Sequence, residues 1–271
     1  MVSKIVRQAT IATELLVSGN LGTMVRNMRR PEIPRTMYRR PLPKPWLDWS
    51  PRRLNTLVVG LKANTYLEIG VDLGHTAERV AVAEKVGVDP TPQFNVDDRP
   101  PGFTFFSVES DTYFASLDPE VNFDLIFLDG LHTFEQTKVD LFNALRHSRT
   151  GVILIDDTVP ADEIAEIPDI DESYARRKEM GSLRREWMGD VWKLVVYIDR
   201  YLPQLDFRTI VGSGNEQTLV WRKERGEELA ERPEDGLEGL TYRDMFADGI
   251  PSIFRTCSEA EAIRVCLAAQ S

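Results

Sequence analysis

The stretch Tyr66-Leu67-Glu68-Ile69-Gly70-Val71-Asp72-Leu73-Gly74-His75-Thr76 combines a short apolar run, a turn with two glycines and the beginning of a helix. The apolar run is typical of a buried strand. Gly70 and Gly74 allow the backbone to turn sharply and to come close to a bulky group. Residues 76–85 have helical spacing, and Gly87 is predicted to end this helix as a C-cap. A strand, a glycine turn and a helix N-terminus form a cradle that suits a polar cofactor.

Two kinds of cofactor-binding fold use such a turn. A dinucleotide-binding fold has the pattern G-x-G-x-x-G, whereas this turn has G-x-x-x-G, with Glu68 two residues before the first glycine. This E-x-G-x-x-x-G spacing resembles motif I of the class I S-adenosylmethionine (SAM) methyltransferases. The resemblance implies that SAM lies over the turn. It assigns to the cofactor Glu68, Gly70, Asp72, Gly74 and Thr76. An ordinary α/β turn without a cofactor is the alternative.

Polar residues follow the next two predicted strands. Residues 86–88 form a short strand that is followed by Asp89, about twenty residues after the glycine turn, where an acid can accept hydrogen bonds from ribose hydroxyls. Residues 103–108 form the third strand, and a polar turn comes after it. The methyltransferase resemblance assigns Ser110 and Asp111 in this turn to the adenine of the cofactor. The same turn equally suits a cap for the next helix.

Two further apolar runs end in acids. The run Leu125–Leu128 is followed by Asp129, and the run Gly151–Ile155 is followed by Asp156-Asp157. Parallel neighbouring strands bring their carboxyl ends to one edge of the sheet, where doubly wound folds bind their ligands. We therefore expect these three carboxylates to lie together in one crevice.

Three carboxylates packed together repel one another unless a cation lies among them. Hard oxygen ligands favour Mg²⁺, with water or substrate oxygens completing its coordination. The sequence therefore predicts a metal site formed by Asp129, Asp156 and Asp157. His132 is the only one of the three histidines predicted to lie beside it. The alternative is that these acids cap helices or loops and bind no metal.

The segments that carry the acids read F-D-L-I-F-L-D-G-L-H at 123–132 and V-I-L-I-D-D at 152–157. They resemble the metal-dependent small-molecule O-methyltransferases, in particular those that methylate the hydroxyls of macrolide and related sugars. The resemblance covers roughly residues 60–222. It implies that Mg²⁺ is bound by Asp129, Asp156 and Asp157, that Asp129 also borders the cofactor, and that His132 is the general base. Some members of the group carry an aspartate closer to the first acid, where this chain has Leu131.

This resemblance implies an α/β fold with the Rossmann-like, seven-stranded sheet of the class I methyltransferases and helices on both faces. The implied function is SAM- and Mg²⁺-dependent O-methylation of a small hydroxylated acceptor, a sugar or glycoside. Mg²⁺ lowers the pKa of the acceptor hydroxyl, and a neutral imidazole can take its proton. A catechol- or phenol-type O-methyltransferase can use the same metal arrangement. A binding protein that keeps the SAM fold without turnover is the non-enzymatic alternative.

Charge and composition divide the chain into three predicted parts. Residues 1–54 form a basic arm with a proline-rich connector, residues 55–222 form the methyltransferase domain with an inserted lid at 158–189, and residues 223–271 form a helical tail. The arm has 11 Lys or Arg and 3 Asp or Glu, hence +8, whereas the remainder has 22 basic and 40 acidic residues, hence −18.

A basic arm can bind nucleic acid or an anionic membrane, or it can pack on its own acidic body or on a partner subunit. The chain has no dense basic block and no RNA-recognition motif. We therefore expect neither nucleic acid nor a membrane as partner, and by resemblance a homodimer or higher homo-oligomer. The sequence shows no signal peptide, no apolar run of membrane-spanning length and only two cysteines without a metal or redox spacing, which favours the cytoplasm.

Overall fold

The computed structural model describes residues 49–224, 232–233 and 236–270. The predicted arm therefore lies outside the described residues up to position 48, and so do residues 225–231, 234–235 and 271 of the predicted tail. The helices and strands are α2 (Trp49–Leu61), β1 (Thr65–Ile69), α3 (His75–Arg79), β2 (Glu84–Val88), η3 (Val96–Asp98), β3 (Phe103–Phe106), α4 (Ser110–Ser116), β4 (Leu125–Leu128), α5 (Phe134–Arg146), β5 (Ile153–Ile155), α6 (Ile170–Glu179), α7 (Trp192–Tyr201), β6 (Leu205–Ile210), β7 (Gln217–Arg222), α8 (Tyr242–Phe246), η4 (Ser252–Phe254), β8 (Thr256–Cys257) and α9 (Glu259–Ala269).

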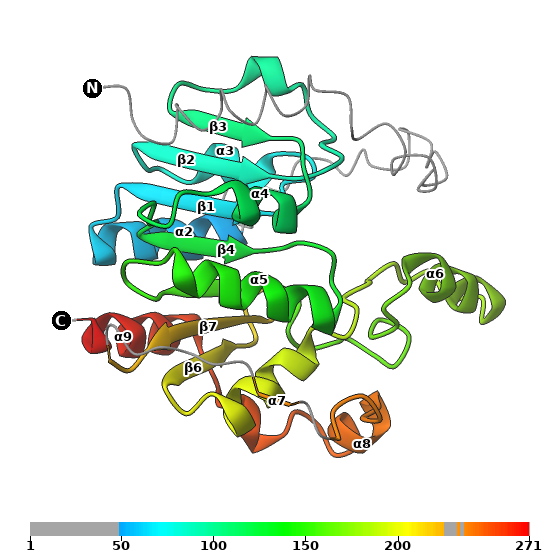
Figure 1. Ribbon diagram of the computed structural model, residues 1–271. Helices are drawn as coiled ribbons and strands as arrows, with labels where there is room; N and C mark the ends of the chain where they lie inside the picture. Colours follow the sequence, from blue (N-terminus) through cyan, green and yellow to red (C-terminus); the bar gives the residue numbers. More distant parts are fainter. Residues whose placement is uncertain (1–48, 225–231, 234–235, 271) are drawn as a thin grey trace.

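The strands form one mixed sheet in the order β3-β2-β1-β4-β5-β7-β6-β8 (Figure 1). Strands β1 to β5 pair in parallel, while β7 is antiparallel to both of its neighbours, β5 and β6. An antiparallel strand inserted at this place is the arrangement expected of a class I methyltransferase, so the predicted fold class is confirmed. The prediction of seven strands is one too few, because the two-residue strand β8 of the tail pairs with β6.

Helices cover both faces of the sheet. Side chains of α4, α5 and α7 pack on one face, and side chains of α2 and α9 pack on the other. Neighbouring residues of a strand point to opposite faces. In β4, Ile126 and Leu128 belong to the first core, whereas Leu125 and Phe127 belong to the second. The central strands are therefore apolar throughout, as a parallel sheet buried on both faces requires.

The helix predicted at residues 76–85 is wrong in length. Helix α3 ends at Arg79, and Glu84–Val88 is a strand, so Gly87 lies inside β2 and is not a C-cap. Lys85, a residue of β2, caps the C-terminal end of α3: its Nζ donates to the carbonyl oxygens of Ala77 and Val80, each at 2.7 Å. Gly87 is required in the strand, since a Cβ there would lie 2.9 Å from the side chains of Phe103 and Val71.

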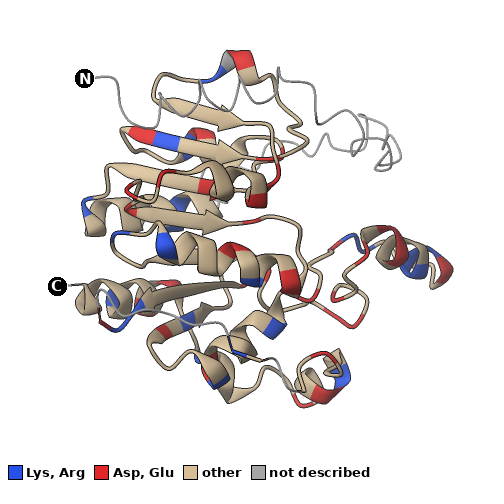
Figure 2. Ribbon diagram, viewed as in Figure 1, with Lys and Arg blue, Asp and Glu red and all other residues tan. Residues whose placement is uncertain are grey.

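Two features outside the sheet matter for the site. Helix α2 begins at Trp49 and packs against α9, so it crosses the boundary predicted at residue 54. Helix α6 of the insertion 158–189 extends away from the sheet, at the right of Figure 1, and it carries both acidic and basic residues (Figure 2). None of the helices in the described part of the chain is long and apolar enough to cross a membrane.

Candidate active site

The ends of β4 and β5 place the predicted acids side by side. Leu128 is paired with Ile155, and the backbone N–H of Asp156 donates to the carbonyl oxygen of Leu128 at 3.0 Å. The residues that directly follow the two strands are therefore neighbours. Acidic segments recur along the loops at the arrowhead ends of the strands (Figure 2). The predicted juxtaposition of the strand ends is thus present.

His132 lies between two of the three carboxylates. Its Nε2 is 3.3 Å from Asp129 Oδ1, and its Nδ1 is 3.2 Å from Asp157 Oδ2. The His132 side chain is 15% exposed, so a ligand can reach it only through a small opening. Nδ1 is buried and has no hydrogen bond of good geometry, although Asp157 is within ion-pair distance. An unsatisfied buried ring nitrogen at such a place indicates a group that is arranged for a ligand.

The backbone is strained at several candidate residues. In the described residues, positive φ occurs at five non-glycine positions, and three of them are Asp72 (45°), His132 (59°) and Asp157 (53°). These three residues lie on the loops that follow β1, β4 and β5. Left-handed conformations of non-glycine residues cost free energy and gather at functional sites, where the surrounding structure enforces them.

The electrostatics of the acids favour a cation. Burial raises the pKa of Asp156 well above its ordinary value, and the charges of Asp157 and Asp129 raise it further. Burial also raises the pKa of Asp129, although hydrogen bonding and charge from His132 act in the opposite direction. Burial alone lowers the pKa of His132, but the neighbouring carboxylates of Asp129 and Asp157 outweigh it and hold the pKa well above its ordinary value.

The residue types fit Mg²⁺, because Asp129, Asp156 and Asp157 supply the carboxylate oxygens that this cation prefers and all three follow the paired strands β4 and β5. In residues 49–224, 232–233 and 236–270, no group of three or more His, Cys, Asp or Glu side chains is gathered closely enough to hold a metal ion. The positive charge between Asp129 and Asp157 comes from the imidazole of His132.

The glycine turn contacts the carboxylate predicted for the ribose. Asp89 Oδ2 accepts hydrogen bonds from the backbone N–H groups of Val71 and Asp72 at 3.0 and 2.9 Å, and its Oδ1 accepts one from Thr91. Asp89 is 8% exposed, so the structure places it against the turn. The turn itself requires glycine at position 70, because a Cβ there would lie 1.8 Å from the carbonyl oxygen of Asp129.

The remaining cofactor residues fall into two surroundings. Glu68 is 1% exposed, and its Oε2 accepts a hydrogen bond from the Tyr66 hydroxyl at 2.6 Å. Burial raises the pKa of Glu68 to about 8, and the Tyr66 hydroxyl is the hydrogen-bond partner of its carboxylate. Gly74 precedes α3 with a φ of 78°, and Thr76 lies in its first turn, half-buried.

Ser110 and Asp111 form the first turn of α4 and share a partner on α5. Gln136 Nε2 lies within hydrogen-bond distance of Ser110 Oγ, Asp111 Oδ1 and Asp140 Oδ1, at 3.2, 3.1 and 3.3 Å. Asp140 is 2% exposed, and burial raises its pKa to about 6. Asp140 was not among the predicted site residues, although an acid at the spacing of the apolar residues of α5 is a signal of burial.

The insertion contacts the site through Trp187. Its ring lies 5.1 Å from the ring of His132, centroid to centroid, and its Nε1 donates to the carbonyl oxygen of Ile167 at 2.8 Å. Gly189 packs directly on the backbone of His132, since a Cβ at this glycine would lie 1.6 Å from the carbonyl oxygen of His132. The loop of the candidate base is therefore covered by residues of the predicted lid.

Comparisons with known proteins agree with this fold. Residues 67–158 match the family model described as a methyltransferase domain. The strand order and this match define a class I methyltransferase domain. The match therefore supports a methyltransferase domain in this part of the chain. No curated protein sequence matches it.

Several solved structures are similar to parts of the chain at low identity. An O-methyltransferase from Bacillus cereus, in complex with S-adenosylhomocysteine, is 17% identical over 79% of this chain and 89% of that one, with a TM-score of 0.41. The O-methyltransferase TomG from Streptomyces achromogenes, in complex with SAM, is 15% identical over 64% and 79%, with a TM-score of 0.42. The amino pentose methyltransferase CalS10 from Micromonospora echinaspora is 16% identical over 42% and 51%, with a TM-score of 0.34.

Proposed function

We propose that this methyltransferase transfers the methyl group of SAM to a hydroxyl of a small acceptor, a sugar or glycoside, with Mg²⁺ as cofactor and His132 as general base. The observation that carries the proposal is the contact of His132 with both Asp129 and Asp157 at the carboxyl edge of the sheet. An alcohol is a weak nucleophile until it loses its proton, so O-methylation needs a proton acceptor at this place.

The chain's own residues have distinct roles in this proposal. Asp129, Asp156 and Asp157 would hold Mg²⁺, which supplies a Lewis acid that lowers the pKa of the acceptor hydroxyl. His132 takes the hydroxyl proton at a ring nitrogen, while the glycine turn at residues 70–74 holds the cofactor. Trp187 and the neighbouring backbone restrict the access of water to His132.

The charges around His132 make the base and the cation interdependent. A general base must begin the reaction without its proton, yet the carboxylates of Asp129 and Asp157 hold the pKa of His132 well above its ordinary value. A cation bound by these carboxylates would offset their charge and favour the neutral imidazole. We therefore expect methyl transfer to require Mg²⁺, or Mn²⁺ in its place.

Aromatic and apolar surface beside His132 suits a ring-shaped acceptor. Leu131 is 53% exposed, and the indole ring of Trp187 lies against His132. A sugar ring can stack on an indole face through its C–H groups, and a catechol ring can stack there equally well. A phenolic acceptor is thus the second candidate. Cytoplasmic location, self-association and the absence of nucleic-acid partners stay predictions of the sequence.

Isothermal titration tests the proposal in two steps. Titrations of S-adenosylhomocysteine and of Mn²⁺ into the wild-type protein and Asp156→Asn should show cofactor binding in both proteins and metal binding only in the wild type. Asp248→Asn is the matched control, because Asp248 is an exposed acid of the tail, remote in sequence from the strand ends. Absence of cofactor binding in the wild type would remove the methyltransferase basis of the proposal.

The acceptor is then sought with labelled SAM, Mg²⁺ and a panel of glycosides and catechols. Transfer to a glycoside that stops with chelator and with His132→Gln supports the proposal. Transfer only to catechols would favour the phenolic alternative. Binding of SAM without transfer to any hydroxyl would favour a non-catalytic SAM-binding protein.

A further inference from the structure

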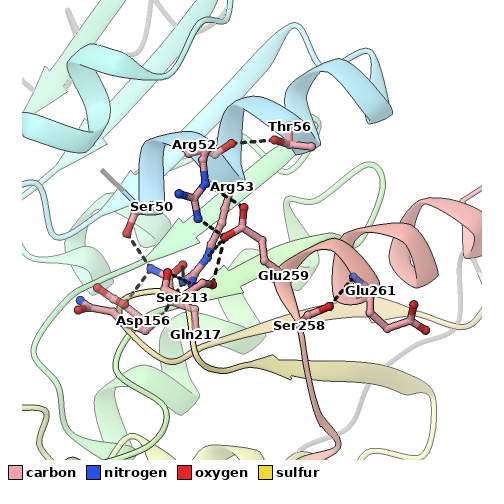
Figure 3. Close-up of polar contacts among 11 residues, drawn as sticks. Ser50, Arg52, Arg53, Thr56, Asp156, Ser213, Gln217, Ser258, Glu259 and Glu261 are labelled. Carbon is pink, nitrogen blue, oxygen red and sulfur yellow. Dashed lines mark hydrogen bonds and ion pairs between the residues drawn. The ribbon is translucent and has the colours of Figure 1, made fainter. Parts of the chain in front are cut away.

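A buried amide holds Asp156 from the side of the sheet. Gln217 Nε2 donates to Asp156 Oδ1 at 2.8 Å and to Ser50 Oγ at 2.7 Å, so both amide hydrogens are used (Figure 3). Gln217 is the first residue of β7 and is fully buried, and Asp156 directly follows the neighbouring strand β5. The carboxylate of Asp156, which is predicted to bind a metal, is therefore hydrogen-bonded to a residue of the neighbouring strand β7.

Arg53 determines which way this amide points. Arg53 Nη1 donates to Gln217 Oε1 at 2.7 Å. A guanidinium has only donors, so the amide oxygen must face Arg53 and the NH₂ group must face Asp156. If the amide were flipped, its NH₂ group would face the donors of Arg53 and its oxygen would face the carboxylate of Asp156. Neither contact could then form a hydrogen bond. The orientation of Gln217 thus follows from the chemistry of its two neighbours.

Arg53 is itself fully fixed. Its side chain is 0% exposed, and its five N–H groups meet five acceptors. Besides Gln217 Oε1, these are the carbonyl oxygen of Asn215, the carbonyl and hydroxyl oxygens of Ser213, and a carboxylate oxygen of Glu259. A buried guanidinium with every donor satisfied has a single well-defined position.

Glu259 connects this arrangement to the C-terminal helix. It is the first residue of α9, and it accepts hydrogen bonds from Arg53 Nε at 3.1 Å and from Arg52. Hydrogen bonds thus connect the carboxylate of Glu259 through Arg53 and Gln217 to the carboxylate of Asp156 (Figure 3): Arg53 donates to Glu259 and to Gln217, and Gln217 donates to Asp156. Two helices packed on the sheet thereby determine the position of one candidate metal ligand.

We propose that Gln217, oriented by Arg53, is a positioning residue for Asp156: it occupies one carboxylate oxygen and leaves the other for the site. Glu259 extends this control to α9. The inference rests on the metal site of the proposed function, because positioning matters most for a ligand that must meet a cation in a defined geometry.

Gln217→Met tests the inference, since methionine has a similar length and shape but no hydrogen-bonding group. We expect the affinity for Mn²⁺ to fall about 10- to 100-fold, the usual effect of removing a partner that orients a metal ligand. The affinity for S-adenosylhomocysteine should stay within about twofold, because its predicted site at the glycine turn is separate. Ser50→Ala is the matched control: it removes the other acceptor of the same NH₂ group and should leave both affinities unchanged.

Crystal structures of the wild type and the variant, without metal, give a readout that does not depend on activity. A carboxylate of Asp156 that turns away from its wild-type orientation in Gln217→Met supports the inference, and an unchanged orientation overturns it. If Gln217→Met does not fold, Arg53→Met is judged by the same criterion, since it keeps much of the side-chain volume but has no donor for the amide oxygen.

The two proposals fail in different ways. A wild-type protein that binds S-adenosylhomocysteine but no Mn²⁺ refutes the metal site of the proposed function, and the orientation of Asp156 in the variant still decides the positioning role. A wild-type protein that binds Mn²⁺ with the same affinity as Gln217→Met, with Asp156 in place, refutes the positioning role alone.

Discussion

Gly189→Ala should displace His132 and leave the cofactor turn intact. Gly189 has a φ of 61°, and a Cβ there would lie 1.6 Å from the carbonyl oxygen of His132. Real contacts of a Cβ are essentially never shorter than 3.0 Å, so the two backbone segments must separate by about 1.4 Å (3.0 minus 1.6) or more. A displacement of about 1 Å in a catalytic group can lower a rate about 100-fold.

Gly181→Ala is the matched control from the same insertion. Gly181 has a φ of 64°, and a Cβ there would meet nothing within 4 Å. Both replacements force alanine into the left-handed region, at a cost of about 1–2 kcal/mol. The contact with His132 should cost Gly189→Ala about 1–3 kcal/mol more, as is usual when a packed region receives extra atoms. Urea unfolding of the two variants measures this difference.

The ring NMR signals of the histidines report the displacement directly. The chain has three histidines, so single substitutions assign the signals of His75, His132 and His147. In Gly189→Ala the His132 signals should shift and those of the other two should not, while calorimetry finds S-adenosylhomocysteine affinity within about twofold of wild type. Unfolding midpoints equal to those of Gly181→Ala, together with unshifted His132 signals, would refute the reasoning.

Three further predictions concern the turn and the lid. Burial raises the pKa of Glu68 to about 8, above its value of 4.5 when unfolded, so its contribution to stability is full below pH 4.5 and is lost as the pH rises toward 8. Glu68→Gln should remove this pH-dependent loss of unfolding free energy, which is at most about 1.4 kcal/mol per pH unit. Urea unfolding of the cofactor-free protein across this pH range measures it, and parallel pH profiles of variant and wild type would contradict the prediction. Trp187→Ala should lower methyl transfer because it uncovers His132, whereas Trp187→Phe, which keeps a ring but not the indole donor, should lose less; an equal loss would assign the effect to the indole hydrogen bond. Gly70→Ala should abolish binding of S-adenosylhomocysteine by calorimetry, since its Cβ would lie 1.8 Å from the carbonyl oxygen of Asp129, and undiminished binding would refute that reasoning.

The sequence predicted the edge of the sheet well because its signals there are local. Each of the two runs before Asp129 and Asp156 is apolar without alternation, which identifies strands buried on both faces. An acid that directly follows such a strand must lie at the carboxyl edge, whatever the rest of the chain does. The observed pairing of Leu128 with Ile155 agrees with this prediction.

The helix after the glycine turn shows where local signals compete. Residues 76–85 have helical spacing, yet Val80 and Val82 are β-branched and favour extended backbone. The strand beside β1 needs Glu84–Val88, and Lys85 satisfies the carbonyl oxygens that the shortened helix leaves open. Pairing in the sheet therefore overrode the helical pattern, which no single-segment argument could foresee.

The contacts behind Asp156 could not be predicted because they join distant parts of the chain. Gln217 is 164 residues from Arg53, and Glu259 is 206 residues from it. Each residue alone resembles an ordinary polar residue of a strand end or a helix. The role of Gln217 emerges only when Arg53 is known to be buried with its donors directed at the same place, and burial of an arginine isn't visible in its sequence neighbourhood.

Close backbone contacts at two glycines lie beside strained residues in this site. The absence of a Cβ lets the backbone at Gly70 pack against the carbonyl oxygen of Asp129. In the same way, the backbone at Gly189 packs against the carbonyl oxygen of His132. His132 and Asp157, in turn, keep left-handed conformations that are unfavourable in isolation. Such strain persists only when close packing leaves no alternative, so the geometry of the site depends on backbone contacts more than on its own side chains. Substitutions of the acids should therefore change the chemistry of the site and leave its backbone in place. Substitutions of Gly70 or Gly189 should instead displace the backbone of the site.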